Sequence, residues 1–330
     1  MTSARRMTFL VISCALVVLS CAPVVDAALD VAPSAASKRA ETNHMAEAAD
    51  THVTVVDDFG RKVTVRHPLR RIVSLAPGPT AMLRAAGAGD RLVATIEYSG
   101  QSASENKLAK IGTADAIDME RLIELRPEVV VVWPDGNNPA QIAAIERLGI
   151  PVYRQEAVTL DGIAESLRRL GKLAGTSGVA DREASALQAK LVALRKEYAS
   201  VSHPPSVLLE VWDRPLYTVG GRELMSDALR VCGARNVFED LPGRAPAIGV
   251  EAVIARNPDI IIAAAPPGSA ASWLAEWSRF PSIRAVRTGR LISFEDQRLI
   301  GLGPGAIDAT AAMCRKIAAL ANQAERTRVK

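Results

Sequence analysis

The sequence predicts an α/β protein of two similar lobes with parallel-type sheets, joined by a long rigid helix. One observation is a repeated pattern: residues 117–133, IDMERLIELRPEVVVVW, and residues 248–264, IGVEAVIARNPDIIIAA, each place a Glu seven residues before a Pro that precedes an apolar run. A second is the alternation of strand-like and helix-like segments, which is the βαβ pattern of parallel sheets. A third is residues 159–201, where two amphipathic helices interrupt that alternation.

The length and composition fit this architecture. A chain of 330 residues suits two lobes of about 100 to 150 residues each, and a hydrophobic fraction of 48% is enough for a sizeable core. The 40 basic and 36 acidic residues are spread along the chain without long runs of one sign. A nucleic-acid partner is therefore not expected.

The N-terminus through Ala27 is predicted to be a signal peptide, which implies export of the chain. Arg5 and Arg6 precede an apolar segment, Met7–Leu19, that is shorter than the roughly 20 residues needed to span a bilayer. Cleavage after Ala27 would release a soluble chain, and we favour this outcome. A lipid anchor at Cys21, in the lipobox-like VLSC, and an uncleaved membrane anchor are the alternatives.

The rest of the chain is predicted to fall into four parts. Residues 28–50 are rich in Ala, Ser and charged residues without apolar periodicity, and are predicted to be a disordered tether. Residues 51–156 form the N-terminal lobe, residues 157–203 the helical bridge and residues 204–330 the C-terminal lobe. A helix of about 20 residues is ~30 Å long, so it can join two lobes as a rigid element.

The N-terminal lobe shows its elements clearly. The alternating HVTVVDDFGRKVTV is typical of a β-hairpin, and a strand, a helix beginning near Thr80 and a second strand follow. Asp118 is expected to cap a helix over Met119–Leu125, which Pro127 ends. Val129–Val132 is apolar at every position and predicts a strand covered on both faces. PAQIAAIERLG and IPVYRQ add a further helix and strand.

The bridge and the C-terminal lobe follow. The second bridge helix has apolar residues at spacings of three and four, namely Ala184, Leu187, Leu191, Leu194 and Tyr198. The strand and helix alternation then returns, and its segments are SVLLEVW, ELMSDALRVCG, GVEAVIARNP, DIIIAAAP, WLAEWSRFP and RLISFE. A last helix is predicted over Ala306–Asn322.

Cysteine usage indicates one disulfide. Cys14 and Cys21 lie in the signal segment, which leaves Cys232 and Cys314 in the mature chain. In an oxidising compartment a solitary pair favours a disulfide, with two free thiols as the alternative.

The sequence offers no catalytic constellation. It contains no G-x-S-x-G, no P-loop and no GxGxxG after a strand, and its four histidines lack metal-ligand spacing. We therefore expect neither an enzyme nor a resident cofactor or metal.

The few aromatic residues point to a ligand cleft. Tyr98 and Trp133 end strands of the first lobe, and Trp212 and Tyr217 follow the first strand of the second. Loops after the carboxyl ends of strands line the crevice of open α/β sheets. With Asp135 in the loop after Trp133, these residues predict a cleft for a large, flat, partly apolar ligand.

Several segments together resemble a known family, the periplasmic binding proteins with a helical backbone that serve ABC importers of cobalamin, haem and ferric siderophores. The segments are RIVSLAPGPTAMLRAAGAGDRLVAT, EYS, IDMERLIELRPEVVVVWPDGNN, PLYTVGG, VCGARNVF and VEAVIARNPDIII. The resemblance covers about residues 53–320 and looks closest to the cobalamin-binding proteins.

The resemblance implies a corrinoid held between the lobes, with Tyr98, Trp133 and Tyr217 on the cleft walls. It implies that Glu120 and Glu251, one per lobe, dock onto arginines of two permease subunits of an ABC importer. Taken alone, each Glu could only stabilise a helix dipole by about 0.3–1 kcal/mol. The cysteine pair also matches the family.

The chain departs from the family pattern in ways that bear on the ligand. SGQSASENK follows the first cleft tyrosine, and Ala114 and Ala245 are small where some relatives have Trp. The last cleft loop, EDQRLIGLGPG, leaves Gln297 and Arg298 as polar contacts. Haem, with Tyr98 as iron ligand, and a ferric siderophore are therefore the alternative ligands, and an extracytoplasmic sensor is the alternative function.

Overall fold

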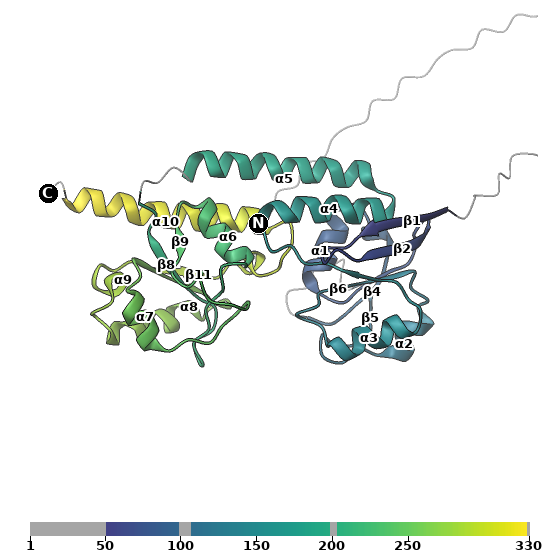
Figure 1. Ribbon diagram of the computed structural model, residues 1–330, viewed down its shortest axis with the longest axis horizontal. Coiled ribbons are helices and arrows are strands. Elements are labelled where there is room, and N and C mark those ends of the chain that lie inside the picture. The colour runs from purple at the N-terminus through teal and green to yellow at the C-terminus, as the bar shows by residue number, and fades with distance from the viewer. Residues whose placement is uncertain (1–50, 99–106, 199–202, 329–330) are drawn as a thin grey trace, which may run out of the picture. The chain divides into compact units, whose positions relative to one another are not determined.

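The computed structural model describes residues 51–98, 107–198 and 203–328 (Figure 1). The predicted signal peptide and tether, residues 1–50, lie outside the described residues. From Asp50 onward the chain forms one compact unit. Within the described ranges, none of the helices is both long and apolar enough to cross a membrane.

The first lobe contains a hairpin and a five-stranded parallel sheet. The hairpin pairs β1 (Thr51–Val56) with β2 (Lys62–His67) antiparallel, as predicted. The sheet has the order β5-β4-β3-β6-β7, with strands β3 (Ile72–Ser74), β4 (Leu92–Thr95), β5 (Ala109–Lys110), β6 (Val129–Val132) and β7 (Val152–Arg154). Its helical elements are α1 (Pro77–Ala85), η1 (Gly89–Arg91), α2 (Met119–Glu124) and α3 (Pro139–Arg147).

Two helix starts in this lobe show how the sequence sets the boundaries. Asp118 caps α2 as predicted, since its side chain accepts a hydrogen bond from the Arg121 N–H at 2.9 Å. Helix α1 begins at Pro77, three residues before the predicted start near Thr80. Proline suits a first helical turn because the N–H groups there have no partner within the helix.

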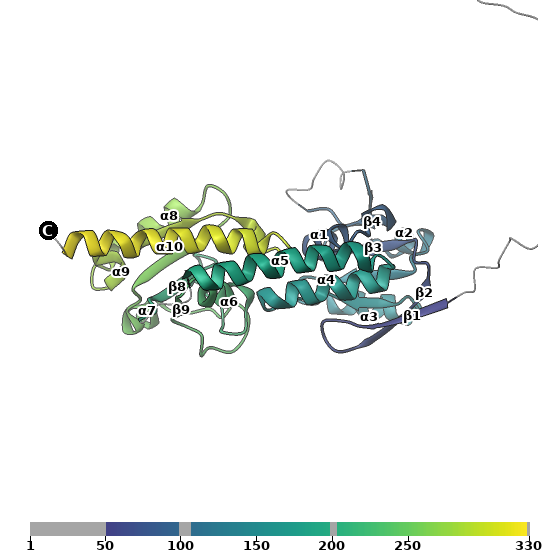
Figure 2. The same ribbon diagram turned by 90° about the horizontal axis from the view of Figure 1, so that it is seen from above.

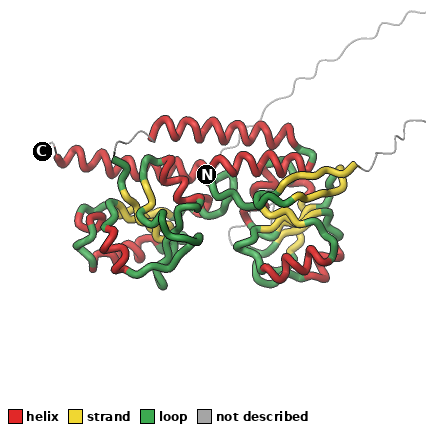
Figure 3. The backbone as a smooth tube through the Cα atoms, viewed as in Figure 1, coloured by secondary structure: helices red, strands yellow, loops and turns green. Residues whose placement is uncertain are grey.

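The second lobe contains a four-stranded parallel sheet (Figure 3). The order is β11-β10-β8-β9, with strands β8 (Ser206–Glu210), β9 (Arg235–Asn236), β10 (Ile260–Ala264) and β11 (Leu291–Phe294). Its helical elements are α6 (Leu224–Val231), α7 (Val250–Arg256), α8 (Ala270–Glu276), η2 (Trp277–Arg279), α9 (Arg284–Arg287), η3 (Gln297–Leu299) and α10 (Ala306–Arg328). Helix α10 continues past the predicted end at Asn322 because no Gly or Pro interrupts the following residues.

Both sheets reverse their winding direction at an inner strand. In the first sheet the chain runs from β3 outward to β4 and β5, then crosses to β6 on the other side of β3. In the second it leaves β8 for β9 and returns to β10 and β11 on the other side. Ligands of open α/β sheets bind beside the carboxyl ends of the strands at such a reversal. The loops after β6 and β8 are therefore placed to form a site.

The two lobes are connected through α4 (Leu160–Ala174) and α5 (Ser177–Tyr198), which lie side by side (Figures 1 and 2). The two helices approach closely, because a Cβ added at Gly171 of α4 would lie 2.2 Å from the Cβ of Ala180. In α5 the residues Ala184, Leu187 and Leu191 are buried, in line with the predicted apolar spacing.

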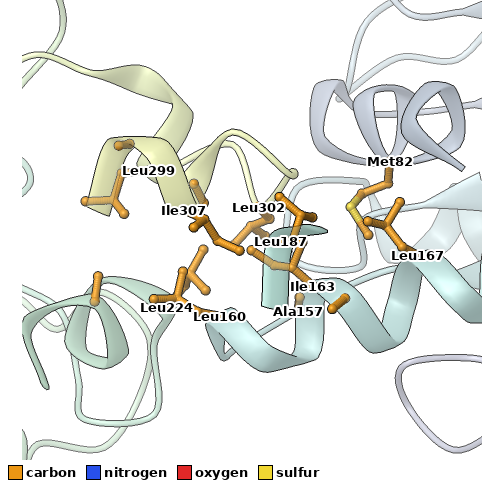
Figure 4. Packing of buried hydrophobic residues seen from close by; sticks show 14 of the residues in the cluster. Met82, Ala157, Leu160, Ile163, Leu167, Leu187, Leu224, Leu299, Leu302 and Ile307 are labelled. Atoms are coloured by element: carbon orange, nitrogen blue, oxygen red, sulfur yellow. The ribbon is translucent and has the colours of Figure 1, made fainter. Parts of the chain in front are cut away.

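One apolar core extends through these helices into both lobes. Figure 4 shows Met82 of α1 beside Leu167 of α4, and Leu160 of α4 near Leu224 of α6. Each lobe also has a buried cluster of its own, around Val130 and Ile145 in the first and around Ile261 and Trp277 in the second. The shared core therefore joins the helical segment to both lobes, while separate cores fill each lobe.

Cys232, which follows α6, and Cys314 of α10 form the predicted disulfide, with an S–S distance of 2.06 Å. Both residues are at most 4% exposed. The bond thus ties the last helix to the body of the second lobe.

The second lobe also buries a carboxyl group. Glu210, at the end of β8, is 3% exposed, and its Oε2 accepts a hydrogen bond of 2.8 Å from the Trp277 indole N–H. Burial raises the pKa of Glu210 to about 7, although the hydrogen bond from Trp277 acts in the opposite direction. The folded protein therefore binds this proton more tightly than the unfolded chain does.

The raised pKa of Glu210 makes the free energy of unfolding depend on pH. The stability that protonated Glu210 contributes is fully present below the pKa that this group has in the unfolded chain, and it is lost as the pH rises through about 7. We expect Glu210→Gln to be more stable than the parent by about 3 kcal/mol above pH 8, and by less than about 1 kcal/mol at pH 5. Urea unfolding across this pH range measures the difference. Exposed Glu276→Gln is the control, and a Glu210→Gln difference that does not change with pH would contradict the assignment.

Candidate functional site

A cavity of ≈ 570 Å³ opens between loops of the two lobes. From the first lobe its lining comprises Trp133, Pro134, Asp135, Asn137 and Pro139. From the second lobe its lining comprises Val211, Val219, Glu223, Leu224, Met225, Arg244, Ala245, Leu299, Ile300 and Leu302. Trp133 follows β6 and Val211 follows β8, so the cavity lies at the reversal points of both sheets.

Trp133 is held by the loop that follows it. The N–H groups of Gly136 and Asn137 donate to the Trp133 carbonyl at 3.0 and 2.9 Å. The Asn137 side chain accepts from the Trp133 N–H at 2.9 Å and donates to the Leu75 carbonyl at 2.7 Å. The indole packs over Gly136, where an added Cβ would lie 2.0 Å from Cε3 of Trp133. The Trp-Pro-Asp-Gly-Asn sequence thus fixes the ring at the carboxyl end of β6.

An ion-pair cluster spans the cavity beside this ring. Arg244 of the second lobe places its Nε 2.6 Å from Oδ2 of Asp135 and 3.4 Å from Oε1 of Glu223. Its Nη2 contacts Oε1 of Glu156, and the same oxygen accepts the Trp133 indole N–H at 3.1 Å. Asp135 and Glu156 belong to the first lobe, so Arg244 connects the two lobes electrostatically.

Burial raises the pKa of two carboxyl groups in this cluster, those of Glu156 and Glu223. Desolvation raises the pKa of Glu156, while Arg244 and the hydrogen bond from Trp133 lower it. Desolvation also raises the pKa of Glu223, and Arg244 again opposes the shift. In both groups the net direction is upward, which means that Arg244 does not fully stabilise their ionised forms.

The backbone of Glu156 is held by Asp58, which lies outside the cavity lining. Its N–H donates to Oδ2 of Asp58 at 2.8 Å. The same carboxylate accepts from Arg169, Tyr153 and Ser166 at 2.8–3.1 Å, and its side chain is 2% exposed. This network joins the hairpin turn to α4 and to the end of β7.

A second cavity, of ≈ 560 Å³, shares Glu223 and Arg244 with the first. It lies between the loops 221–223 and 239–244. These loops touch because Gly220 and Gly221 lack side chains: an added Cβ would lie 2.2 Å from the Gly243 carbonyl oxygen and from the Glu239 carbonyl oxygen, respectively. Arg244 therefore lines both cavities.

Much of the lining of the first cavity is apolar. Val219, Leu224, Met225, Leu299 and Leu302 are each at most 8% exposed. A tryptophan, several aliphatic groups and a small polar cluster make the lining typical of a site that binds a small molecule.

The structure brings together two of the seven predicted ligand-binding residues, Trp133 and Asp135. Tyr98 is partly buried against the core beneath the first sheet. Trp212 is 51% exposed and packs edge-on against Trp273, with ring centroids 6.2 Å apart. Neither belongs to the cavity lining, so their ligand contacts stay predictions.

The remaining predicted contacts also lie outside that lining. Tyr217 pairs through its backbone with Trp212 and Ala247. Gln297 donates its side-chain N–H to the Ala265 carbonyl at 2.9 Å. Arg298 forms an ion pair of 2.6 Å with Asp296. Their proposed roles toward a ligand stay predictions as well.

The sequence reasoning did not single out three residues of the ion-pair cluster, Glu156, Glu223 and Arg244. Glu156 carried a usable signal, since it lies just beyond the carboxyl end of β7. Arg244 sits in a Pro- and Gly-rich loop far along the chain from its acidic partners. Only the fold brings these charges together.

Glu120 and Glu251 occupy equivalent places in the two lobes. Each is an exposed residue in the first turn of its helix, α2 or α7. After each helix, the residue directly before the repeated proline has a positive φ: Arg126 at φ 44° after α2 and Asn257 at φ 45° after α7. The repeated sequence therefore builds the same local structure twice.

No group of three or more His, Cys, Asp or Glu side chains suited to a metal ion occurs among residues 51–98, 107–198 and 203–328.

Two parallel sheets, joined by helices and facing one cavity with their reversal-point loops, define a two-lobed ligand-binding protein. Residues 72–297 match the family model described as periplasmic binding protein. The chain belongs to this family.

Individual proteins and solved structures are also similar to this chain. A vitamin B12-binding protein of Photorhabdus laumondii is 30% identical over 75% of this chain and 87% of its own length. One of Vibrio campbellii is 32% identical over 64% of this chain and 76% of its own length. The crystal structure of the periplasmic vitamin B12 binding protein BtuF of Vibrio cholerae has a TM-score of 0.69 at 27% identity, covering 77% of this chain and 98% of that one. The periplasmic heme-binding protein RhuT of Roseiflexus sp. shares the fold, with a TM-score of 0.65 at 22% identity, covering 77% of this chain and 99% of that one.

Proposed function

We propose that this protein captures cobalamin, or a related corrinoid, in the cavity between its lobes and delivers it to an ABC importer in the membrane. The observation that carries the proposal is a cavity at the reversal points of both sheets, in a chain about 30% identical to vitamin B12-binding proteins.

The chemistry of the cavity supports a corrinoid. A corrin is a large, flat ring with apolar faces and an amide-bearing rim. The Trp133 indole offers a flat surface for such a face, and Leu224 and Leu302 add aliphatic area to the lining. Asp135, Glu223 and Arg244 supply polar partners for the rim.

Haem is the less favoured ligand. The proposed iron ligand, Tyr98, is not among the residues that line the cavity. The similarity to the heme-binding protein RhuT supports a common fold only. The corrinoid therefore fits the observations better than haem does.

The protein acts in the periplasm, which agrees with its family and with the predicted signal peptide. Its partner there is the membrane importer, and the two docking points are Glu120 and Glu251. Their equivalent, exposed positions in α2 and α7 fit a partner with two similar permease subunits.

Reversing both docking charges separates binding from delivery. We expect Glu120→Arg with Glu251→Arg to keep the corrinoid affinity within about twofold, because surface charges far from a site contribute little to it. Stimulation of the importer's ATPase should fall to the level seen without binding protein. The control pair is Asp181→Arg with Glu276→Arg, which changes the net charge equally at exposed positions outside α2 and α7. Unchanged ATPase stimulation by the docking variant would contradict the assignment.

Thermal unfolding with a ligand panel tests the proposed function. A ligand that binds only the folded state stabilises it by about 2.7 kcal/mol at a concentration of 100 times its Kd. We expect cyanocobalamin and cobinamide to raise the melting temperature, and haemin and a ferric hydroxamate to leave it nearly unchanged. A rise with haemin alone would transfer the function to haem, and no rise with any of the four would reject both ligands.

A further inference from the structure

We propose that the ion-pair cluster around Arg244 makes the cavity selective for a corrinoid with amidated side chains and against ligands that carry free carboxylates. The inference rests on the proposed function and adds to it the residues that set specificity, Asp135 and Glu223.

The cavity wall around Arg244 carries more carboxylates than cations. Arg244 faces three carboxylates, and its closest contact is with Glu156, whose side chain is 6% exposed. Asp135 and Glu223, whose side chains are 44% and 14% exposed, contact the same guanidinium. Because Arg244 is already paired with Glu156, its single positive charge does not neutralise these two carboxylates as well. The wall is therefore acidic where a ligand would meet it.

The second cavity does not reverse this charge. The lining of the two cavities contains the cations Arg222 and Arg244, and the carboxylates Asp135, Glu223, Glu239 and Asp240. Asp240 is paired with Arg256 through two contacts of 2.5 and 2.9 Å. Once this pair is set aside, carboxylates still outnumber cations in the lining.

The carboxylates of the cavity wall also determine which hydrogen-bonding groups a ligand can present. An ionised carboxylate only accepts hydrogen bonds, so a ligand group that meets Asp135 or Glu223 has to donate. A primary amide has two N–H donors and meets this demand. A ligand carboxylate has none at neutral pH and would also face a like charge, which costs several kcal/mol in an interface.

The desolvation of Glu223 agrees with this demand. Burial raises the pKa of Glu223 despite the nearby guanidinium of Arg244. The ionised Glu223 thus lacks part of the stabilisation that water would give it. N–H donors from a bound ligand would supply that missing part.

Two corrinoids that share one ring test the inference. Dicyanocobinamide carries amide side chains, and dicyanocobyrinic acid carries carboxylic acids at the same positions. Calorimetric titration of each near pH 7.5 gives two values of Kd and their ratio. We expect the parent to bind the amide form at least about tenfold more tightly, which is a conservative value for a like-charge clash.

Neutralising the wall should remove the preference. In Asp135→Asn with Glu223→Gln, both side chains keep their size and gain donors, and we expect the ratio to fall below about threefold. The matched control is Glu165→Gln with Asp181→Asn, which removes two exposed carboxylates of α4 and α5 and should keep the parent ratio. If the double variant unfolds, Asp135→Asn alone replaces it, because a side chain that is 44% exposed tolerates this substitution. It should lower the ratio part of the way, since it removes one of the two carboxylates.

The outcomes separate the inference from the proposed function. Equal affinity of the parent for both corrinoids, or a ratio that survives in the neutralised variants, would overturn the inference and leave the function standing. Failure of the parent to bind either corrinoid would reject the proposed function, and the inference with it.

Discussion

Trp133→Ala is expected to weaken cyanocobalamin binding by about hundredfold, as measured by calorimetric titration. The indole is the large aromatic surface in the described cavity lining, and truncating a central aromatic residue of a desolvated site typically costs 2 kcal/mol or more. Its ring is fixed before any ligand arrives, by Glu156 at the indole N–H and by Gly136 beneath it. Binding to the parent therefore does not have to order this side chain, and the variant loses a preorganised contact.

The matched control is Phe59→Ala, which removes an aromatic ring that is 48% exposed in the hairpin turn. It should bind within about twofold of the parent, as expected for a surface substitution. An affinity of Trp133→Ala within about threefold of the parent would show that the ligand does not contact this ring.

Removing the disulfide is expected to lower the free energy of unfolding by about 4 kcal/mol. Cys232 and Cys314 are separated by 82 residues, and closing a loop of this length restricts the unfolded chain strongly. The loop includes β10, β11 and most helices of the second lobe. Its loss should therefore destabilise the lobe that carries Arg244.

Urea unfolding of Cys232→Ala with Cys314→Ala measures this effect. The parent in a thiol reductant should show the same loss, which controls for the two substitutions themselves. A loss below about 1 kcal/mol in both would mean that the bond adds little to stability.

The sequence predicted the two sheets well because buried parallel strands have a clear pattern. Val129–Val132 and Ile260–Ala264 are buried at every position, as a strand covered on both faces requires. Asp118 was predictable as a cap because a single local hydrogen bond defines the role. The disulfide was predictable because only one cysteine pair remained after the signal segment.

The candidate site was only partly predictable. Trp133 and Asp135 could be found because they follow a predicted strand directly. The partners of Arg244 lie in three separate segments, and no spacing along the chain connects them. The aromatic residues show the same limit: Trp212 follows a strand as Trp133 does, but it packs against Trp273 and lies outside the cavity lining, so its ligand contact stays a prediction. The direction of a side chain after a strand depends on packing that the sequence pattern does not contain.

The most direct test of the central claim is a calorimetric titration of the purified mature chain with cyanocobalamin. The account predicts saturable binding of one corrinoid per chain, which is weakened about hundredfold in Trp133→Ala and kept in Phe59→Ala. Absence of binding to a parent chain that unfolds cooperatively would contradict it.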